Sequence, residues 1–140
     1  MSHTLEGKIE GMALVSELNQ REHWAQRHAR AKSQQSVARA HIQSKKRNCI
    51  PTTVITLTRI APRNFDDGNL QACFKHVQDG IAQGLRIDDG SPLVLWVYEQ
   101  EKGKPKEYAF KYEIEPYAHY VARKAQDFNR ALADNFVLSD

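Results

Sequence analysis

The sequence predicts an α/β (α+β) domain with a small mixed β-sheet, a crossover helix and flanking helices. A run rich in β-branched residues with proline near both ends, residues 51–62, is typical of a strand. Apolar residues at helical spacing follow over about 69–83, and a second apolar run occupies 93–100. A strand, a helix and a second strand in this order favour a right-handed parallel unit.

Two elements are expected before this unit. Residues 8–15 fit a short strand or an ordered lead-in. Residues 16–44 contain neither proline nor glycine and are rich in Ala, Gln and Arg, which favours a long helix. Its apolar stripe is thin, with Trp24, Ala31, Ala38 and Ile42 at helical spacing, so we expect it to lie across another part of the fold.

The segment after the parallel unit predicts a hairpin and a last helix. Turn residues at 101–107 are expected to connect to a third strand over 108–115, which adds to the sheet antiparallel. A final helix is predicted at 117–135. Gly84 is the expected terminator of the crossover helix, because glycine adopts the left-handed C-cap conformation readily.

Length and composition predict one domain over residues 1–140, with a basic helical arm at about 16–48. Cys49 and Cys73 lack metal-binding or disulfide-framework spacing, which favours reduced thiols. No apolar run reaches the roughly 18 residues of a membrane span, and the first residues lack the apolar core of a secretion signal. We therefore expect a soluble, cytoplasmic protein.

The net charge of +3 is distributed unevenly along the chain. Residues 21–47 contain a single acid, Glu22, and eight basic residues: Arg21, Arg27, Arg30, Lys32, Arg39, Lys45, Lys46 and Arg47. Such a segment predicts contacts with a nucleic-acid backbone. Two alternatives stay open, a solvated helix face and an arm that becomes ordered only on binding.

Two aspartate pairs, Asp66-Asp67 and Asp88-Asp89, bracket the crossover helix. The first pair follows the carboxyl end of a strand, where open α/β sheets bind ligands. Oxygen ligands in a cluster suit Mg²⁺, which substrate phosphates complete. Helix capping and turn formation explain the same residues without any ligand.

Lys75 lies on the predicted crossover helix, four residues before Asp79. It can stabilise negative charge on a phosphate, or it can form a surface ion pair with Asp79. A helix of about 15 residues is roughly 22 Å long, so the two aspartate pairs are expected to lie apart in one chain. A site that uses both pairs then requires the chain to fold back or a homodimer with shared sites.

The motifs DDGNL at 66–70, FKHVQDGI at 74–81 and LRIDD at 85–89 follow one another in this order. This succession resembles the core of the RusA-like Holliday-junction resolvases, small dimeric endonucleases of phages and prophages. The resemblance covers about residues 51–115. It implies Mg²⁺-dependent cleavage of branched DNA in recombination and repair, with Asp66 and Asp89 as metal ligands.

Two positions depart from the family pattern. The second motif aspartate falls on Gly68, for which Asp67 would substitute from one residue earlier. The family lysine falls on Ala72, and Lys75 lies about 4.5 Å further along the helix axis. Three interpretations therefore stay open: an active endonuclease, a RusA-like DNA-binding protein with weakened or lost cleavage, and a phage accessory module that binds another protein.

Overall fold

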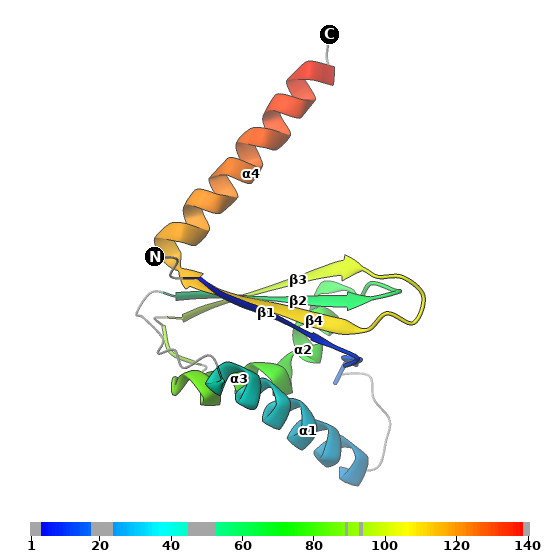
Figure 1. The fold of residues 1–140 in the computed structure, drawn as a ribbon. Helices are drawn as coiled ribbons and strands as arrows, with labels where there is room; N and C mark the ends of the chain where they lie inside the picture. The colour runs from blue at the N-terminus through cyan, green and yellow to red at the C-terminus, as the bar shows by residue number, and fades with distance from the viewer. Residues whose placement is uncertain (1–3, 18–23, 45–52, 89, 93, 139–140) are drawn as a thin grey trace.

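A computed structural model describes residues 4–17, 24–44, 53–88, 90–92 and 94–138 (Figure 1). The elements in chain order are β1 (Leu5–Glu10), α1 (Trp24–Gln43), β2 (Thr53–Ala61), α2 (Asp67–Cys73), α3 (Lys75–Leu85), β3 (Val94–Lys102), β4 (Ala109–Pro116) and α4 (Tyr117–Leu138). Helices and a single mixed sheet combine as the sequence predicts, which confirms the α+β fold class.

The sheet has the strand order β1-β4-β2-β3. β2 and β3 are parallel, which confirms the crossover unit, whereas β4 is antiparallel to both β1 and β2. The predicted hairpin is wrong, because β4 pairs with β2 and not with β3. The connection passes the carboxyl end of β2, where the Gly103 N–H donates to the Ala61 carbonyl at 2.8 Å.

Burial explains this strand order. β2 is buried at all but one of its positions, so it takes a central place with a neighbour on each side. β4 carries the buried Phe110, Tyr112 and Ile114, which suit a second inner strand. The charged second half of β3 is better tolerated at an exposed edge of the sheet.

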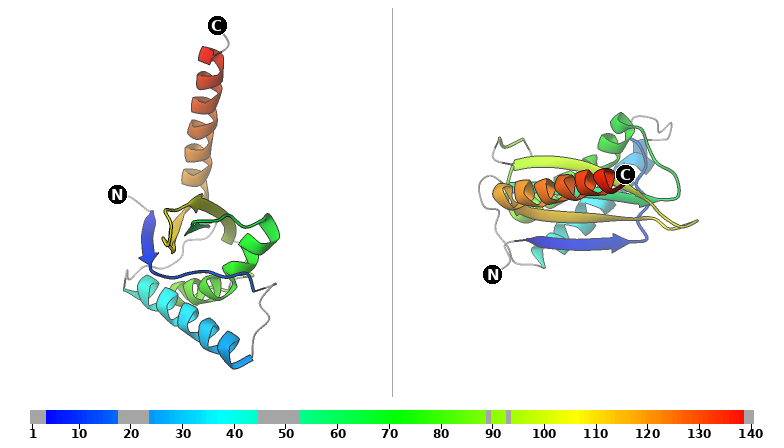
Figure 2. Two further views of the ribbon diagram at one scale, coloured as in Figure 1. Left: turned by 90° about the vertical axis from the view of Figure 1, so that its right-hand side faces the viewer. Right: turned by 90° about the horizontal axis from the view of Figure 1, so that it is seen from above.

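α1 and α3 cover one face of the sheet (Figures 1 and 2). Ile55, Leu57 and Phe110 point into this layer and are fully buried. The buried residues of α1 are Gln34, Ala38 and Ile42, so only the second half of the predicted stripe is confirmed. Trp24, the first residue of that stripe, is 72% exposed.

α1 and α3 approach each other closely at two glycines of α3. A Cβ atom at Gly80 would collide with the Gln35 carbonyl oxygen, and one at Gly84 would lie 2.8 Å from the Ile42 Cβ. The prediction that Gly84 ends the helix is therefore wrong. The helix continues to Leu85, and Arg86 caps it in the left-handed conformation with φ 59°.

The crossover helix is two helices, α2 and α3, that meet at Phe74. Phe74 is fully buried and its ring stacks on Tyr98 of β3, with 5.9 Å between the ring centroids. The bend therefore lets this side chain enter the core between the helices and the sheet. At the other end of the chain, β1 begins three residues before the predicted strand.

α4 begins directly after β4 and stands away from the sheet on the side opposite α1 and α3 (Figures 1 and 2). It is longer than the predicted helix and reaches Leu138. Among the described residues, no helix combines the length and the apolar character needed to cross a membrane.

Candidate functional site

The first aspartate pair lies where the sequence predicts, between the carboxyl end of β2 and the start of α2. Asp66 is the N-cap of α2, and its Oδ1 accepts a hydrogen bond from the Asn69 N–H at 2.9 Å. Asp67 is the first helical residue, and both aspartates are exposed. The positive end of the helix dipole favours carboxylates at this position.

Contacts from distant parts of the chain fix this loop. The Ser16 hydroxyl donates to the Asn69 side-chain oxygen. The Gln100 amide of β3 bonds both backbone groups of Phe65, with distances of 2.9 Å to the N–H and 2.7 Å to the carbonyl. The Arg59 guanidinium lies 3.6 Å from the centre of the Phe65 ring. The loop is thus held on both sides of its carboxylates.

Gly68 is exposed and lies between Asp67 and Asn69 in the first turn of α2. A Cβ atom built at Gly68 would have open space around it: beyond its own helix turn, the Asp66 Oδ1 at 3.9 Å is the one atom of the described residues within 4 Å. The position therefore accepts a side chain. An aspartate there would begin directly beside the Asp66 carboxylate.

Asp88, the described member of the second aspartate pair, lies toward the amino-terminal end of the parallel strands, opposite to the end where Asp66 lies. Asp88 follows α3 and precedes β3, whose first residue, Val94, pairs with Thr53 at the start of β2. A nine-residue strand is roughly 30 Å long at about 3.3 Å per residue, so one chain does not bring Asp88 to Asp66. Asp89 lies outside the described residues.

Asp88 has a local structural role. Its Oδ1 accepts a hydrogen bond from the Gly90 N–H at 3.0 Å, which is a turn interaction. Within the described ranges of the chain, no group of three or more His, Cys, Asp or Glu side chains is placed to hold a metal ion. Of the three predicted metal ligands, the described part of the chain brings Asp66 and Asp67 together.

Lys75 is the first residue of α3 and is exposed, so its ammonium is accessible to a phosphate. The adjacent His76 is buried and lies 3.5 Å from a carboxylate oxygen of Glu17. Burial lowers the pKa of His76 below its ordinary value, although Glu17 opposes this shift. Burial likewise raises the pKa of the Cys73 thiol to about 12, so this thiol is a structural group.

The basic arm is described over α1. Arg27, Lys32 and Arg39 are exposed there, as a surface that contacts phosphates requires. Arg30 differs, because its guanidinium donates two hydrogen bonds to the Glu17 carboxylate at 2.9 and 2.8 Å. The other four predicted DNA-contacting residues lie outside the described ranges: Arg21, Lys45, Lys46 and Arg47.

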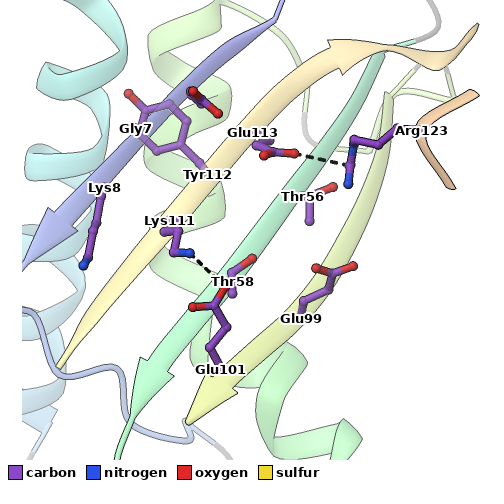
Figure 3. Close-up of a pocket in the computed structure, with 11 residues that line it drawn as sticks. Gly7, Lys8, Thr56, Thr58, Glu99, Glu101, Lys111, Tyr112, Glu113 and Arg123 are labelled. Atoms are coloured by element: carbon purple, nitrogen blue, oxygen red, sulfur yellow. Dashed lines mark hydrogen bonds and ion pairs between the residues drawn. The ribbon is translucent and has the colours of Figure 1, made fainter. Parts of the chain in front are cut away.

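The open face of the sheet carries a charged hollow of about 450 Å³ that the sequence did not reveal (Figure 3). Lys111 bonds Glu101 across it at 2.8 Å, and Arg123 of α4 lies 3.2 Å from Glu113. The buried hydroxyl of Thr56 also lines the hollow. Strand register and the position of α4 bring these residues together from distant parts of the chain, so no local motif signals them.

The root of α4 is built around a buried carboxylate at the end of β4. Glu115 is 1% exposed and accepts hydrogen bonds from Arg123 at 2.6 Å and from His119 at 2.5 Å. Burial alone would raise the pKa of Glu115, but these two hydrogen bonds bring it below its ordinary value. The cluster fixes the direction in which α4 leaves the sheet.

Comparisons of the chain with protein-family models, with curated proteins and with solved structures found no match.

Proposed function

We propose that the protein is a Mg²⁺-dependent, structure-specific endodeoxyribonuclease of the RusA-like type that acts on branched DNA, in the cytoplasm and as a homodimer. The observation that supports this most is the placement of Asp66 and Asp67. Both carboxylates are exposed at the start of α2, and neither forms an ion pair with the described residues.

The donor set fits Mg²⁺. This ion is commonly bound by one or two carboxylates, with water and substrate phosphates completing its coordination. When bound, it would activate a water and stabilise the oxygen that leaves the phosphodiester. Asp66 is held in place by its cap to Asn69, which in turn accepts from Ser16, so the first ligand is positioned before DNA arrives.

The remaining groups divide between phosphate and metal. Lys75, exposed at the start of α3, would neutralise charge on the scissile phosphate. Asp89 is proposed as a further metal ligand. Asp88 and Asp66 lie at opposite ends of the parallel strands β2 and β3. Asp89 would therefore join the site from a second subunit, in line with the resemblance to dimeric resolvases.

A second candidate function is DNA binding with weakened or lost cleavage. Gly68 supports it, because the resemblance places a metal-binding aspartate there and glycine offers no ligand. The open space at Gly68 makes Gly68→Asp a direct test. A third candidate, a module that binds another protein, is supported by the capping role of Asp66 and the turn role of Asp88.

Asp66→Asn is expected to lower the rate of junction cleavage by at least about a hundredfold, as does removal of a strong electrostatic contact in other enzymes. Asparagine is also a good N-cap, so the start of α2 should remain folded. The measurement is single-turnover cleavage of a labelled four-way junction in Mg²⁺. Asp134→Asn, which removes an exposed carboxylate from α4, is the matched control and should cleave normally.

Lys32→Ala and Arg39→Ala are each expected to weaken junction binding and to make its salt dependence shallower by about one in the slope of log affinity against log salt. Both residues are exposed on α1. Titrations at several salt concentrations measure the slope. Arg130→Ala on α4 removes the same charge outside the arm and is the control. An equal change in its salt slope would show that the effect is not specific to α1 and would contradict the placement of α1 in the DNA interface.

A further inference from the structure

α4 is in contact with the rest of the subunit only near its start, among the described residues. Arg123 bonds Glu113 and Glu115 of β4, and Lys124 bonds Glu99 of β3 at 3.0 Å. Beyond these residues the helix stands free (Figures 1 and 2). Its 22 residues make it about 33 Å long, so most of this length has no packing partner among the described residues of the subunit.

The free part of α4 carries an apolar stripe. Tyr117, Val121, Ala125, Phe128 and Leu132 lie within an arc of about 80° around the helix axis. All five are exposed, and Phe128 reaches 64%. From Val121 onward the spacing alternates between four and three residues, which is the spacing of a coiled-coil seam.

The charged residues of α4 leave this stripe clear. Arg123, Asp127, Arg130 and Asp134 lie within an arc of about 60° on the opposite side of the helix. Lys124 borders the stripe, but its ammonium is turned to Glu99 of its own sheet. A partner helix can therefore contact the stripe without burying an unpaired charge.

We propose that this stripe is a dimer interface and that its occupant is α4 of a second copy of the chain, packed antiparallel. In the register centred between Gln126 and Asp127, Val121 of one copy faces Leu132 of the other. Ala125 then faces Phe128, so the two central layers each pair a small side chain with a large one.

A parallel pair fits less well. It would place Phe128 against Phe128 and Ala125 against Ala125, which gives one overfilled layer and one underfilled layer. The antiparallel pair is also isologous, since each contact is repeated by two-fold symmetry and the assembly closes at two copies.

One pair of helices about 33 Å long buries less than the roughly 1,200–2,000 Å² of a standard stable interface. We therefore expect a dimer that dissociates on dilution into the micromolar range. The contact places the two sheets at opposite ends of the helix pair. Because it keeps the two sheets apart, this contact does not bring Asp88 of one subunit near Asp66 of the other, so a metal site shared between subunits would need a separate contact. The α4 interface is independent of whether Asp66 binds a metal.

Sedimentation equilibrium between about 1 and 100 µM tests the interface, a range set by the affinity expected for a small contact. The native chain should associate to a dimer. Phe128→Asp should remain monomeric with an unchanged circular dichroism spectrum, because the side chain is exposed in the single subunit. Gln126→Asp, which adds the same charge off the stripe, should dimerise like the native chain.

Cysteine pairing tests the orientation. Val121→Cys and Leu132→Cys proteins, mixed under mild oxidation, should form a disulfide-linked heterodimer, while neither links to itself. Two copies of residue 121 would lie about 16 Å apart along the helix pair, beyond the roughly 7 Å that a disulfide spans between Cα atoms. The native chain, which contains Cys49 and Cys73, gives the background.

Three results would overturn the inference: a native chain that is monomeric throughout, a Phe128→Asp protein that still dimerises, or a Val121→Cys protein that links to itself. The nuclease activity is read separately. A monomer that cuts junctions would refute the α4 interface and the sharing of Asp89 between subunits, but it would leave the nuclease activity. A dimer without cleavage would support the interface and refute the nuclease.

Discussion

Gly80→Leu is expected to destabilise the protein by about 3 kcal/mol, a large part of the total stability of a domain this size. The new side chain would point into the contact between α3 and α1. Its Cβ would collide with the Gln35 carbonyl oxygen and would lie 2.9 Å from the Ala38 Cβ. Because the first obstacle is backbone, the two helices must separate and expose core surface.

Urea denaturation followed by circular dichroism measures the effect of Gly80→Leu. Gly68→Ala is the matched control, since a Cβ there meets open space and alanine is favoured over glycine in a helix by about 0.5–1 kcal/mol. Gly68→Ala should therefore leave stability unchanged or raise it. Equal stability of the Gly80→Leu and native proteins would show that α1 does not pack on α3 as described.

Arg123→Leu is expected to cost about 3 kcal/mol, because it removes the main partner of the buried Glu115 carboxylate. The Glu115 side chain has no exposed surface and would keep only the hydrogen bond from His119. Leucine preserves much of the packing volume of Arg123, so the loss of stability reports the removal of its positive charge. Arg130→Leu, at an exposed site of the same helix, is the control and should have little effect.

The pH dependence of stability gives this prediction a second readout. Since the folded state lowers the pKa of Glu115, its interactions stabilise the protein above the ordinary pKa of 4.5 and are lost as pH falls through the lowered value. Arg123→Leu should therefore flatten the acid limb of the stability profile below about pH 4.5. An acid limb as steep as the native one would contradict the role of Glu115.

Local sequence patterns were sufficient for elements whose own residues determine their structure. The β-branched run around Val54 predicts β2, and the amphipathic pattern after Tyr117 predicts α4. The partner of β4 was not predictable in this way. It depends on which strand needs a second buried neighbour, and the turn residues at 101–107 fit a crossover as well as a hairpin.

Glycine positions show the same limit. Gly84 looks like a helix terminator because glycine is common there, yet its role is to admit Ile42 of α1. That contact joins residues far apart in the sequence, so no window around Gly84 contains it. The spacing of Gly80 and Gly84, one helical turn apart, was the available signal for a close helix contact.

The candidate site was predicted in part. The position of Asp66 and Asp67 at the start of a helix followed from their place after a strand. The groups that hold the loop, Ser16 and Gln100, come from 53 and 35 residues away and have no local signature. The separation of the two aspartate pairs was expected from helix length. The sheet register confirms it for Asp88 and Asp66, which lie at opposite ends of the parallel strands.

The most direct test of the proposed nuclease is cleavage of a labelled synthetic four-way junction by the native protein, first in Mg²⁺ and then in Mn²⁺. We expect paired, symmetric nicks in opposite strands that disappear in Asp66→Asn. Tight, salt-sensitive binding without nicks, converted to cleavage by Gly68→Asp, would identify a DNA-binding protein that has lost its chemistry. Absence of cleavage in both the native and the Gly68→Asp proteins would contradict the assignment of a metal-dependent nuclease site to Asp66.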